Sequence, residues 1–520
     1  MDIVFIAGRI IHPRYNESSG DHMLCAGRRL RKNNYTCRSV VHKRIIPAQI
    51  MVRNGIPACF KLLPVKAALI IVCAFILHPG NGWAQTALTR QQAEEDIDFY
   101  VRTVKASHYQ PFLHITEKAY DNRIAAIKHS MGDSIGIRDF VSLFYQVTAL
   151  LGDAHSTPVP GQPVFREEFG KEQFFPYRLL ANSHQLYVPA SLAKDLGIPA
   201  GAAITDINGE NINTLFRQAE AGIAGLPSFR EEAAGRLFSY FLFLRNIRPP
   251  FVLGYKNRNG MAGKSAPIAG VTFKKALSAS MPHIVQPYTH QILQQKLGYI
   301  DIRSLSGDID QFRAFLDTSF RQFNEAGIQH LAIDLRQNSG GNTDLGDLLF
   351  SYISDKKYTW GTKHWKISQP YKDQLKAGGD TTSAYLQKTN GAVWASENSC
   401  LPKENPFGNN IRFKGKIYFI TGPFTFSSAM AVADVVKTYG LGTIVGQPTG
   451  ENVKDFGEAF VITLPNSKIR IQSTTSLSTG ADCHRKKNGP VQPDVMAGNT
   501  LQDDISGRDK TVEYILGTIR

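Results

Sequence analysis

Cysteine, charge and long apolar runs are all scarce in this chain of 520 residues. Six cysteines are too few for a scaffold built on disulfides. Apolar residues make up 42% and charged residues 20%, as in ordinary soluble globular proteins, which excludes collagen-like and wholly disordered chains. Only one apolar run is long enough to matter, so a multi-span membrane protein is also excluded. The motifs Gly-x-Ser-x-Gly, His-Glu-x-x-His and paired Cys-x-x-Cys are absent, which argues against an α/β-hydrolase elbow and the common zinc sites.

The net charge of +15 lies mostly near the N-terminus. Residues 1–66 hold 12 Lys and Arg against 3 Asp and Glu, and residues 67–84 hold none of these four types. The remaining chain carries a net charge of only +6. Such a mildly basic body gives no reason to expect a nucleic-acid partner.

The apolar run, residues 67–77, has the surroundings of an export signal. Two lysines precede it, and the small residues Gly82 and Ala84 follow at the positions that a signal peptidase reads. The run is short for a bilayer span, which takes about 20 residues. We therefore predict a signal peptide over 51–84, with 1–50 as a leader or mis-assigned start. The alternative is an uncleaved anchor or a buried helix.

Cleavage predicts a mature chain that is periplasmic or extracellular and has no stable membrane span. Of the six cysteines, only Cys400 and Cys483 would remain. An oxidising compartment permits a disulfide between them, but the sequence leaves open whether they pair.

Three domains are expected after the signal. Residues 85–155 favour a small helical domain, because Thr89 to Gln92 form a capping-box motif and apolar residues then recur at helical spacing. In residues 156–280, the phrase Gly201 to Gly209 ends in an Asn-Gly hairpin signal and a helical stretch follows. This pattern resembles a PDZ-like module, which binds extended peptide ends as an added strand. The alternative is another small β-rich domain.

Residues 281–520 alternate between strand and helix patterns. This order predicts an α/β domain with a mostly parallel sheet covered by helices. A polar, Gly-rich stretch over 355–410 suggests a surface excursion, and a late hairpin is expected around Pro465 and Asn466. The predicted strands and helices of the α/β core are 297–302, 309–323, 331–335, 343–354, 416–420 and 427–439.

Three phrases carry candidate chemistry. In Asp334 to Gly341, Asp-Leu-Arg-Gln-Asn-Ser-Gly-Gly, two glycines after a strand can turn amides toward a ligand, although a plain tight turn has the same pattern. In Thr421 to Ala429, a serine at a helix start has free amides beside it, which suits a nucleophile but also a simple cap. The third phrase is the loop with Asp153 and His155, in which the histidine is a candidate general base.

Together these phrases resemble the tail-specific, or C-terminal-processing, serine peptidase family over roughly residues 88–520. The resemblance implies a ClpP/crotonase-like catalytic core that needs no cofactor or metal. It further implies Ser427 as nucleophile, with the amide of Ser428 and that of Gly340 or Gly341 forming the oxyanion hole.

The sequence departs from this family at two positions. One branch uses a lysine base 25 residues after the serine, where this chain has Asn452. The chain therefore resembles the tricorn-like branch, in which an upstream histidine is the base, here His155. A glutamate that often follows the serine is replaced by Met430. Asp153 is a possible orienting group, and Lys454, two residues past the lysine position, is the alternative base.

The leading hypothesis is an exported serine endopeptidase that binds polypeptide substrates, in part through an extended peptide end in the PDZ-like domain. One alternative is a catalytically inactive protein that binds peptide or apolar ligands on the same scaffold. A more distant alternative is a related enzyme acting on acyl thioesters.

Overall fold

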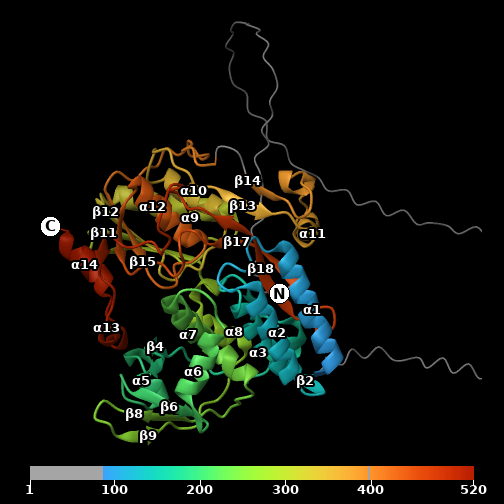
Figure 1. The fold of residues 1–520 in the computed structure, drawn as a ribbon. Helices are drawn as coiled ribbons and strands as arrows, with labels where there is room; N and C mark the ends of the chain where they lie inside the picture. Colours follow the sequence, from blue (N-terminus) through green and yellow to red (C-terminus); the bar gives the residue numbers. More distant parts are fainter. Residues whose placement is uncertain (1–85, 396–398, 520) are drawn as a thin grey trace, which may run out of the picture. The chain divides into compact units, whose positions relative to one another are not determined.

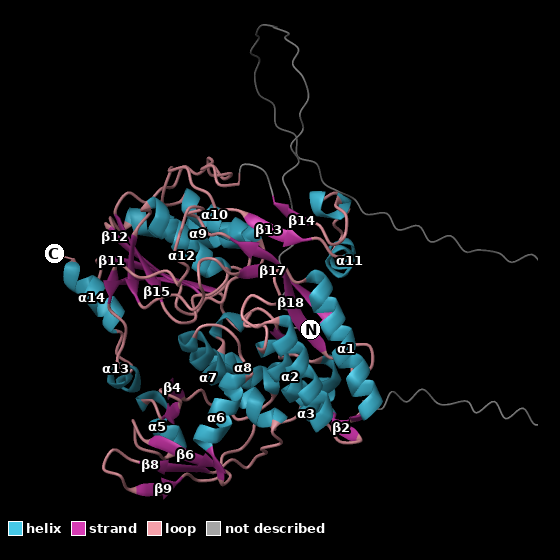
Figure 2. Cartoon of the chain, viewed as in Figure 1, coloured by secondary structure: helices cyan, strands magenta, loops and turns pink. Residues whose placement is uncertain are grey.

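The computed structural model describes residues 86–395 and 399–519, which belong to one compact unit. It has the mixed α/β architecture predicted from the sequence, with several sheets and many helices (Figures 1 and 2). The predicted leader and signal segments, 1–50 and 51–84, lie outside the described residues. Across the described ranges, no helix combines the length and the apolar character that crossing a bilayer requires.

The first described segment is mainly helical. The predicted capping box is confirmed: the Thr89 side chain accepts the Gln92 amide, and the Gln92 side chain accepts the Thr89 amide. Ala93, Ile97 and Val104 form the buried face of the helix that follows. The elements are β1 (Ala87–Thr89), α1 (Arg90–Ser107), α2 (Glu117–Ser130), β2 (Ser134–Gly136), which pairs with β1, and α3 (Ile137–Ala149).

A small antiparallel sheet with flanking helices follows. The hairpin predicted at Asn208 and Gly209 is confirmed, and both residues have the positive φ angles that such a turn requires, 52° and 84°. The strands are β4 (Leu180–Asn182), β5 (Gln185–Tyr187), β6 (Ala203–Ile207), β7 (Glu210–Asn211), β8 (Leu253–Lys256) and β9 (Ala262–Lys264). The helices are α4 (Arg166–Phe169), α5 (Ala190–Leu196), α6 (Ile212–Ala221), α7 (Pro227–Leu244) and α8 (Phe273–Ser280).

A six-stranded sheet forms the centre of the α/β part. Its strand order is β10-β11-β12-β15-β16-β19; β10 is antiparallel to β11, and the other neighbours are parallel. The strands are β10 (Tyr288–Leu293), β11 (Leu297–Ile302), β12 (His330–Asp334), β15 (Lys416–Thr421), β16 (Thr443–Gly446) and β19 (Val495–Met496). The helices are α9 (Ile309–Glu325), α10 (Thr343–Ser351), α12 (Ser428–Tyr439), α13 (Leu501–Ser506) and α14 (Lys510–Thr518).

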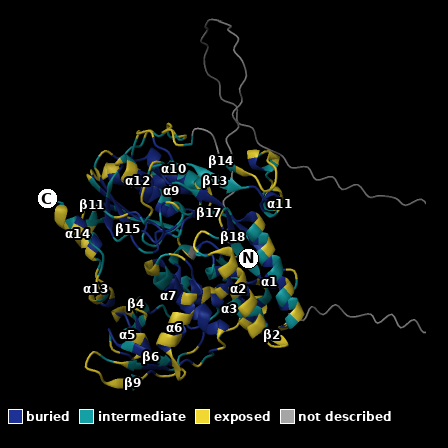
Figure 3. Cartoon of the chain, in the orientation of Figure 1, coloured by how far each residue is buried: buried dark blue, intermediate teal, exposed yellow. Residues whose placement is uncertain are grey.

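This sheet is covered on both faces, because alternate residues of its central strands enter different apolar clusters. Leu331 and Ile333 of β12 pack with α9, α10 and α12, whereas Ala332 packs with Ile515 of α14. Figure 3 shows these central strands as largely buried. In α/β sheets, ligands bind in the loops beyond the carboxyl ends of the strands.

The stretch 355–410 is more structured than the predicted surface excursion. It contributes β13 (Lys363–Lys366), α11 (Gln369–Ala377) and β14 (Val393–Ala395). These strands join a sheet of order β14-β13-β18-β17, in which β17 (Phe456–Thr463) and β18 (Arg470–Ser478) form the predicted late hairpin. The short strand β3 (Thr157–Pro158) also pairs with β18, and this pairing brings the end of the helical segment to the hairpin.

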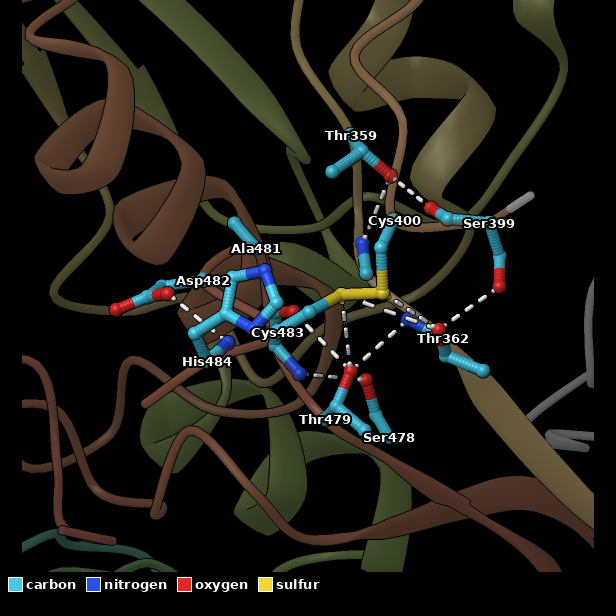
Figure 4. Close-up of a disulfide and its surroundings, with 12 residues drawn as sticks. Thr359, Thr362, Ser399, Cys400, Ser478, Thr479, Ala481, Asp482, Cys483 and His484 are labelled. Atoms are coloured by element: carbon cyan, nitrogen blue, oxygen red, sulfur yellow. Dashed lines mark hydrogen bonds between the residues drawn. A yellow bond between two sulfur atoms is a disulfide. The ribbon is translucent and has the colours of Figure 1, made fainter. Parts of the chain in front are cut away.

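Cys400 and Cys483 form a disulfide, with their Cα atoms 6.0 Å apart (Figure 4). The bond joins the segment after β14 to the loop after β18, across a sequence separation of 83 residues. The side chains of Thr362 and Thr479 lie against its sulfur atoms. A disulfide is typically worth about 2–4 kcal/mol of folding free energy.

Candidate active site

Ser427 stands at the turn between β15 and α12, in a backbone conformation that residues other than glycine rarely adopt. Its φ and ψ angles are 54° and −127°. Its neighbours Phe426 and Ala429 are buried, whereas Ser427 itself is partly exposed. A strained strand-to-helix turn that presents a serine is typical of nucleophiles in hydrolases.

The glycine turn predicted from Asp334 to Gly341 lies directly against this serine. A Cβ atom on Gly340 would lie 2.6 Å from the Ser427 Cβ, and a Cβ on Gly341 would lie 2.2 Å from the backbone oxygen of Leu305. Both glycines have positive φ angles, 110° and 143°. Only glycine therefore fits at these two positions.

The two glycine amides differ in their availability. The Gly340 N–H donates to Asn338 Oδ1 at 2.8 Å, and Gly340 is buried. Gly341 is exposed, and its N–H makes no hydrogen bond with the described residues. Its carbonyl accepts from Ser428 Oγ at 2.8 Å, which ties the turn to the first residue of α12. Of the two glycine amides, that of Gly341 is therefore better placed to form an oxyanion hole with the Ser428 amide.

His155 lies on the loop after α3, and its ring packs against Phe426 with the centroids 4.6 Å apart. The side chain is 8% exposed, and neither ring nitrogen has a hydrogen-bond partner among the described residues. Nδ1 lies 3.6 Å from Asp153 Oδ1 and 3.5 Å from Glu451 Oε1. Catalytic hydrogen bonds are often this long before substrate binds.

Glu451, which the sequence did not single out, connects the histidine to the serine. It is buried, and while its Oε1 lies beside His155, its Oε2 accepts the Ser427 N–H at 2.5 Å. It stands next to Asn452, at the lysine position of the other branch. In the sequence, only its residue type and its place beside the lysine position could have pointed to Glu451. A single sequence does not show whether a loop glutamate is buried.

Asp153 is fully buried and anchors the histidine loop. It accepts the backbone N–H of His155 at 2.8 Å, Ser156 Oγ at 2.6 Å and Thr474 Oγ1 at 2.8 Å. It also accepts from His108 Nε2 at 3.2 Å. The Gln110 N–H donates to His108 Nδ1, so the ring proton of a neutral His108 is on Nε2. Burial alone would raise the pKa of Asp153, but the hydrogen bond from His108 and the nearby His155 hold it well below its ordinary value.

His108 and Thr474 were also missed from the sequence. Thr474 belongs to four consecutive buried hydroxyl residues in the middle of β18. Polar residues in the interior of a strand are a usable signal, because a buried polar group needs a partner. His108 offered no comparable signal.

Lys454, the alternative base, lies apart from this cluster. Lys454 is exposed, and its backbone N–H donates to Asn488 Oδ1. In the described part of the chain, its side chain makes no ion pair or hydrogen bond with the site. Met430, which replaces the family glutamate, lies in the first turn of α12 and is buried in the core.

The carboxylates around His155 change its proton affinity. Burial lowers the pKa of His155, but the charges of Glu451, Asp153 and Asp455 outweigh burial and raise it to about 9. Burial raises the pKa of Glu451 above its ordinary range, while the neighbouring His155 opposes that rise. The two groups lie in contact and share their titration, and the pair retains a proton at neutral pH.

A Glu451→Gln variant is expected to move the pH dependence of the site to lower pH. A histidine base acts only when it is neutral, so activity rises as the pH passes upward through its pKa. Glu451 makes the largest contribution that raises this pKa. Removing its charge therefore moves the rising limb toward the ordinary histidine value of about 6.5. The measurement is the second-order rate of labelling by a serine-reactive phosphonate between pH 5 and 10.

Glu458→Gln is the matched control. Glu458 pairs with Lys363 and accepts a hydrogen bond from Tyr371, away from the histidine. Removing the charge of Glu458 is expected to leave the pH at which the labelling rate rises unchanged. If the labelling rate of Glu451→Gln also rises at the same pH as that of the wild type, Glu451 does not set the pKa of His155.

Comparisons with known proteins agree with this architecture. Residues 296–496 match the model of peptidase family S41. The match covers the segment with the central sheet, the glycine turn, Ser427 and Glu451. It confirms the resemblance seen in the sequence and supports a protease function.

Two solved structures show how far the likeness extends. The chain is 14% identical to mature CPAF in complex with lactacystin, over 82% of this chain and 97% of that one, with a TM-score of 0.56. It is 12% identical to a photosystem II D1 C-terminal processing protease, over 80% and 96% of the two chains, with a TM-score of 0.40. At such identity the similarity to CPAF shows the fold alone. No curated protein matches the sequence.

Proposed function

We propose that the chain is an exported serine endopeptidase that hydrolyses peptide bonds by acyl transfer, with Ser427 as nucleophile and His155 as general base. The supporting observation is the arrangement around Ser427: a strained serine, a free glycine amide, and a buried histidine linked to it through Glu451. Each member has a distinct role in acyl transfer.

In the first half of the reaction, Ser427 Oγ attacks the substrate carbonyl carbon and gives its proton to His155. Because Nδ1 faces Glu451 and Asp153, Nε2 is the atom that takes the proton. The carbonyl oxygen becomes an oxyanion, to which the N–H groups of Ser428 and Gly341 donate. His155 then protonates the departing amine as the carbon–nitrogen bond breaks, leaving an acyl-enzyme.

In the second half, a water molecule attacks the acyl carbon. His155 takes a proton from the water and returns it to Ser427 Oγ as the acid is released. Glu451 and Asp153 stabilise the imidazolium in both halves through their charges.

A fluorophosphonate probe tests the proposal. Such a probe bonds covalently to an activated serine and releases its leaving group. Labelling located at Ser427 by peptide mapping supports acyl transfer. Absence of labelling between pH 7 and 9.5 would favour the inactive ligand-binding alternative, for which the long His155 contacts are the relevant observation.

We further propose that the sheet of β4, β5, β6, β8 and β9 is a PDZ-like module that takes an extended end of the polypeptide substrate. The support is the confirmed hairpin at Asn208 and Gly209, followed by α6. Main-chain pairing with a sheet edge would provide affinity with little sequence demand.

Export is the remaining part of the proposal. The signal-like segment 51–84 and the disulfide between Cys400 and Cys483 support it, because such bonds persist in oxidising compartments. Intact-mass analysis of the secreted or periplasmic protein, after treatment with an alkylating agent, is expected to show an N-terminus near Gln85 and no free thiol. A mature chain that retains 67–84 would instead favour an anchor.

A further inference from the structure

Helix α7 places a buried arginine behind the candidate active site. The Arg236 side chain is 0% exposed. Its Nε donates to Glu232 Oε1 at 2.8 Å, and its Nη1 donates to the carbonyl of Ser280 at 3.2 Å. Glu232 and Ser280 both precede residues 296–496, the segment that matches the S41 model.

The same guanidinium also contacts both loops of the site. Its Nη2 donates to Gln337 Oε1 at 2.6 Å, and its central carbon lies 3.9 Å from the centroid of the Phe424 ring. Gln337 is three residues before Gly340 in the glycine turn, and Phe424 is three residues before Ser427. A single side chain thus bridges the segments that present the two oxyanion donors.

Phe229, from the first turn of α7, makes a second attachment to the serine loop. Its ring stacks on Phe424 and on Phe426, at centroid distances of 5.9 Å and 4.4 Å. Phe426 in turn packs against His155. Helix α7 therefore contacts the serine loop through Phe229 and Arg236, and the glycine turn through the bond from Arg236 to Gln337.

Burying an arginine is costly unless its donors are all used, so its presence here needs an explanation. Its planar fork donates in fixed directions while its face stacks on an aromatic ring, which a lysine cannot reproduce. These properties suit a part that fixes the distance and orientation between two loops.

We propose that Arg236 is a positioning residue, which holds the glycine turn and the serine loop in register so that the amides of Gly341 and Ser428 converge on one oxyanion. It acts through Gln337 and Phe424 and does not touch the reacting atoms. This inference rests on the proposed function, because it concerns the geometry of the same site.

The test measures the maximal inactivation rate (kinact) and the apparent affinity (KI) of the fluorophosphonate separately. Gln337→Leu is expected to lower kinact about 10- to 100-fold, as misplacement of about 1 Å does at catalytic sites, with little change in KI. Gln337→Glu keeps an oxygen for Arg236 Nη2 and is expected to retain most of the rate.

A double-mutant cycle tests whether Arg236 acts through Gln337. Arg236→Lys is expected to lower kinact as well. If the two residues form one unit, combining Arg236→Lys with Gln337→Leu costs no more than the worse single change. Additive losses would overturn the coupling.

Arg178→Lys is the control for stability alone. Arg178 Nη2 lies 2.5 Å from Glu232 Oε1, and it contacts neither Gln337 nor Phe424. It is expected to leave kinact unchanged. If Arg236→Lys fails to fold, the comparison of Gln337→Leu with Gln337→Glu decides whether Arg236 positions the loops. Gln337 is partly exposed, and replacing it leaves the ion pair between Arg236 and Glu232 in place.

The outcomes separate this inference from the proposed function. A wild-type protein that is not labelled at Ser427 contradicts the proposed function itself. A labelled wild type whose Gln337→Leu variant is labelled equally fast contradicts only the positioning role of Arg236.

Discussion

Replacing Ser427 with alanine is expected to abolish phosphonate labelling and to lower peptidase activity by about 10⁴-fold or more, the scale seen when a serine nucleophile is removed. The variant deletes only one hydroxyl from a partly exposed position, so the fold should persist. Labelling followed by peptide mapping, with the unfolding temperature measured in parallel, checks the result.

Ser428→Ala is the matched control. Ser428 contributes its backbone N–H, and its hydroxyl donates only to the Gly341 carbonyl. Loss of one such hydrogen bond is expected to reduce labelling by no more than about tenfold. The opposite pattern, with Ser428→Ala inert and Ser427→Ala active, would move the nucleophile by one residue and the oxyanion donor to Ala429.

Replacing His155 with alanine is expected to lower activity at least about 100-fold, the lower end for removal of a general base. Lys454→Ala is expected to cost little. Lys454 is exposed, and a lysine base must be buried to lose its proton near pH 7. The measurement is the second-order labelling rate at pH 9, close to the raised pKa of His155.

A dead Lys454 variant beside an active His155 variant would reverse the assignment. The protein would then belong to the branch with a serine–lysine pair, in an altered loop. An intermediate loss in both variants would contradict the assignment of His155 as sole base.

The sequence predicted most of the α/β elements, because apolar periodicity there coincides with clear start and stop signals. Asp308 caps α9, and Gly327 follows its end with a positive φ angle of 66°. Helix α7 was missed because it has no polar face over most of its length: twelve of its residues are buried, so no amphipathic pattern appears. The strands β13 and β14 were missed because they are short and lie in a polar stretch.

The site was predictable where motif and geometry coincide. Ser427 and the glycine turn stand at strand ends, where α/β sheets place their loops. Glu451, His108 and Arg236 were not predictable, because each acts through a contact between segments distant in sequence. A single sequence holds no record of such pairings, and their residue types are common in loops and helices.

The pairing of β3 with β18 also has a consequence for when the chain becomes a protease. Thr157 pairs with Gln472, so the loop with His155 reaches its place only after a strand more than 300 residues later has been made. The segment that matches the S41 model, 296–496, contains Ser427, the proposed nucleophile, but not His155, the proposed base. Ribosomal synthesis delivers the N-terminal half first, and contacts of such large sequence separation form late in folding. Under the proposed mechanism, peptidase activity is therefore expected only late in folding, after β18 has paired with β3.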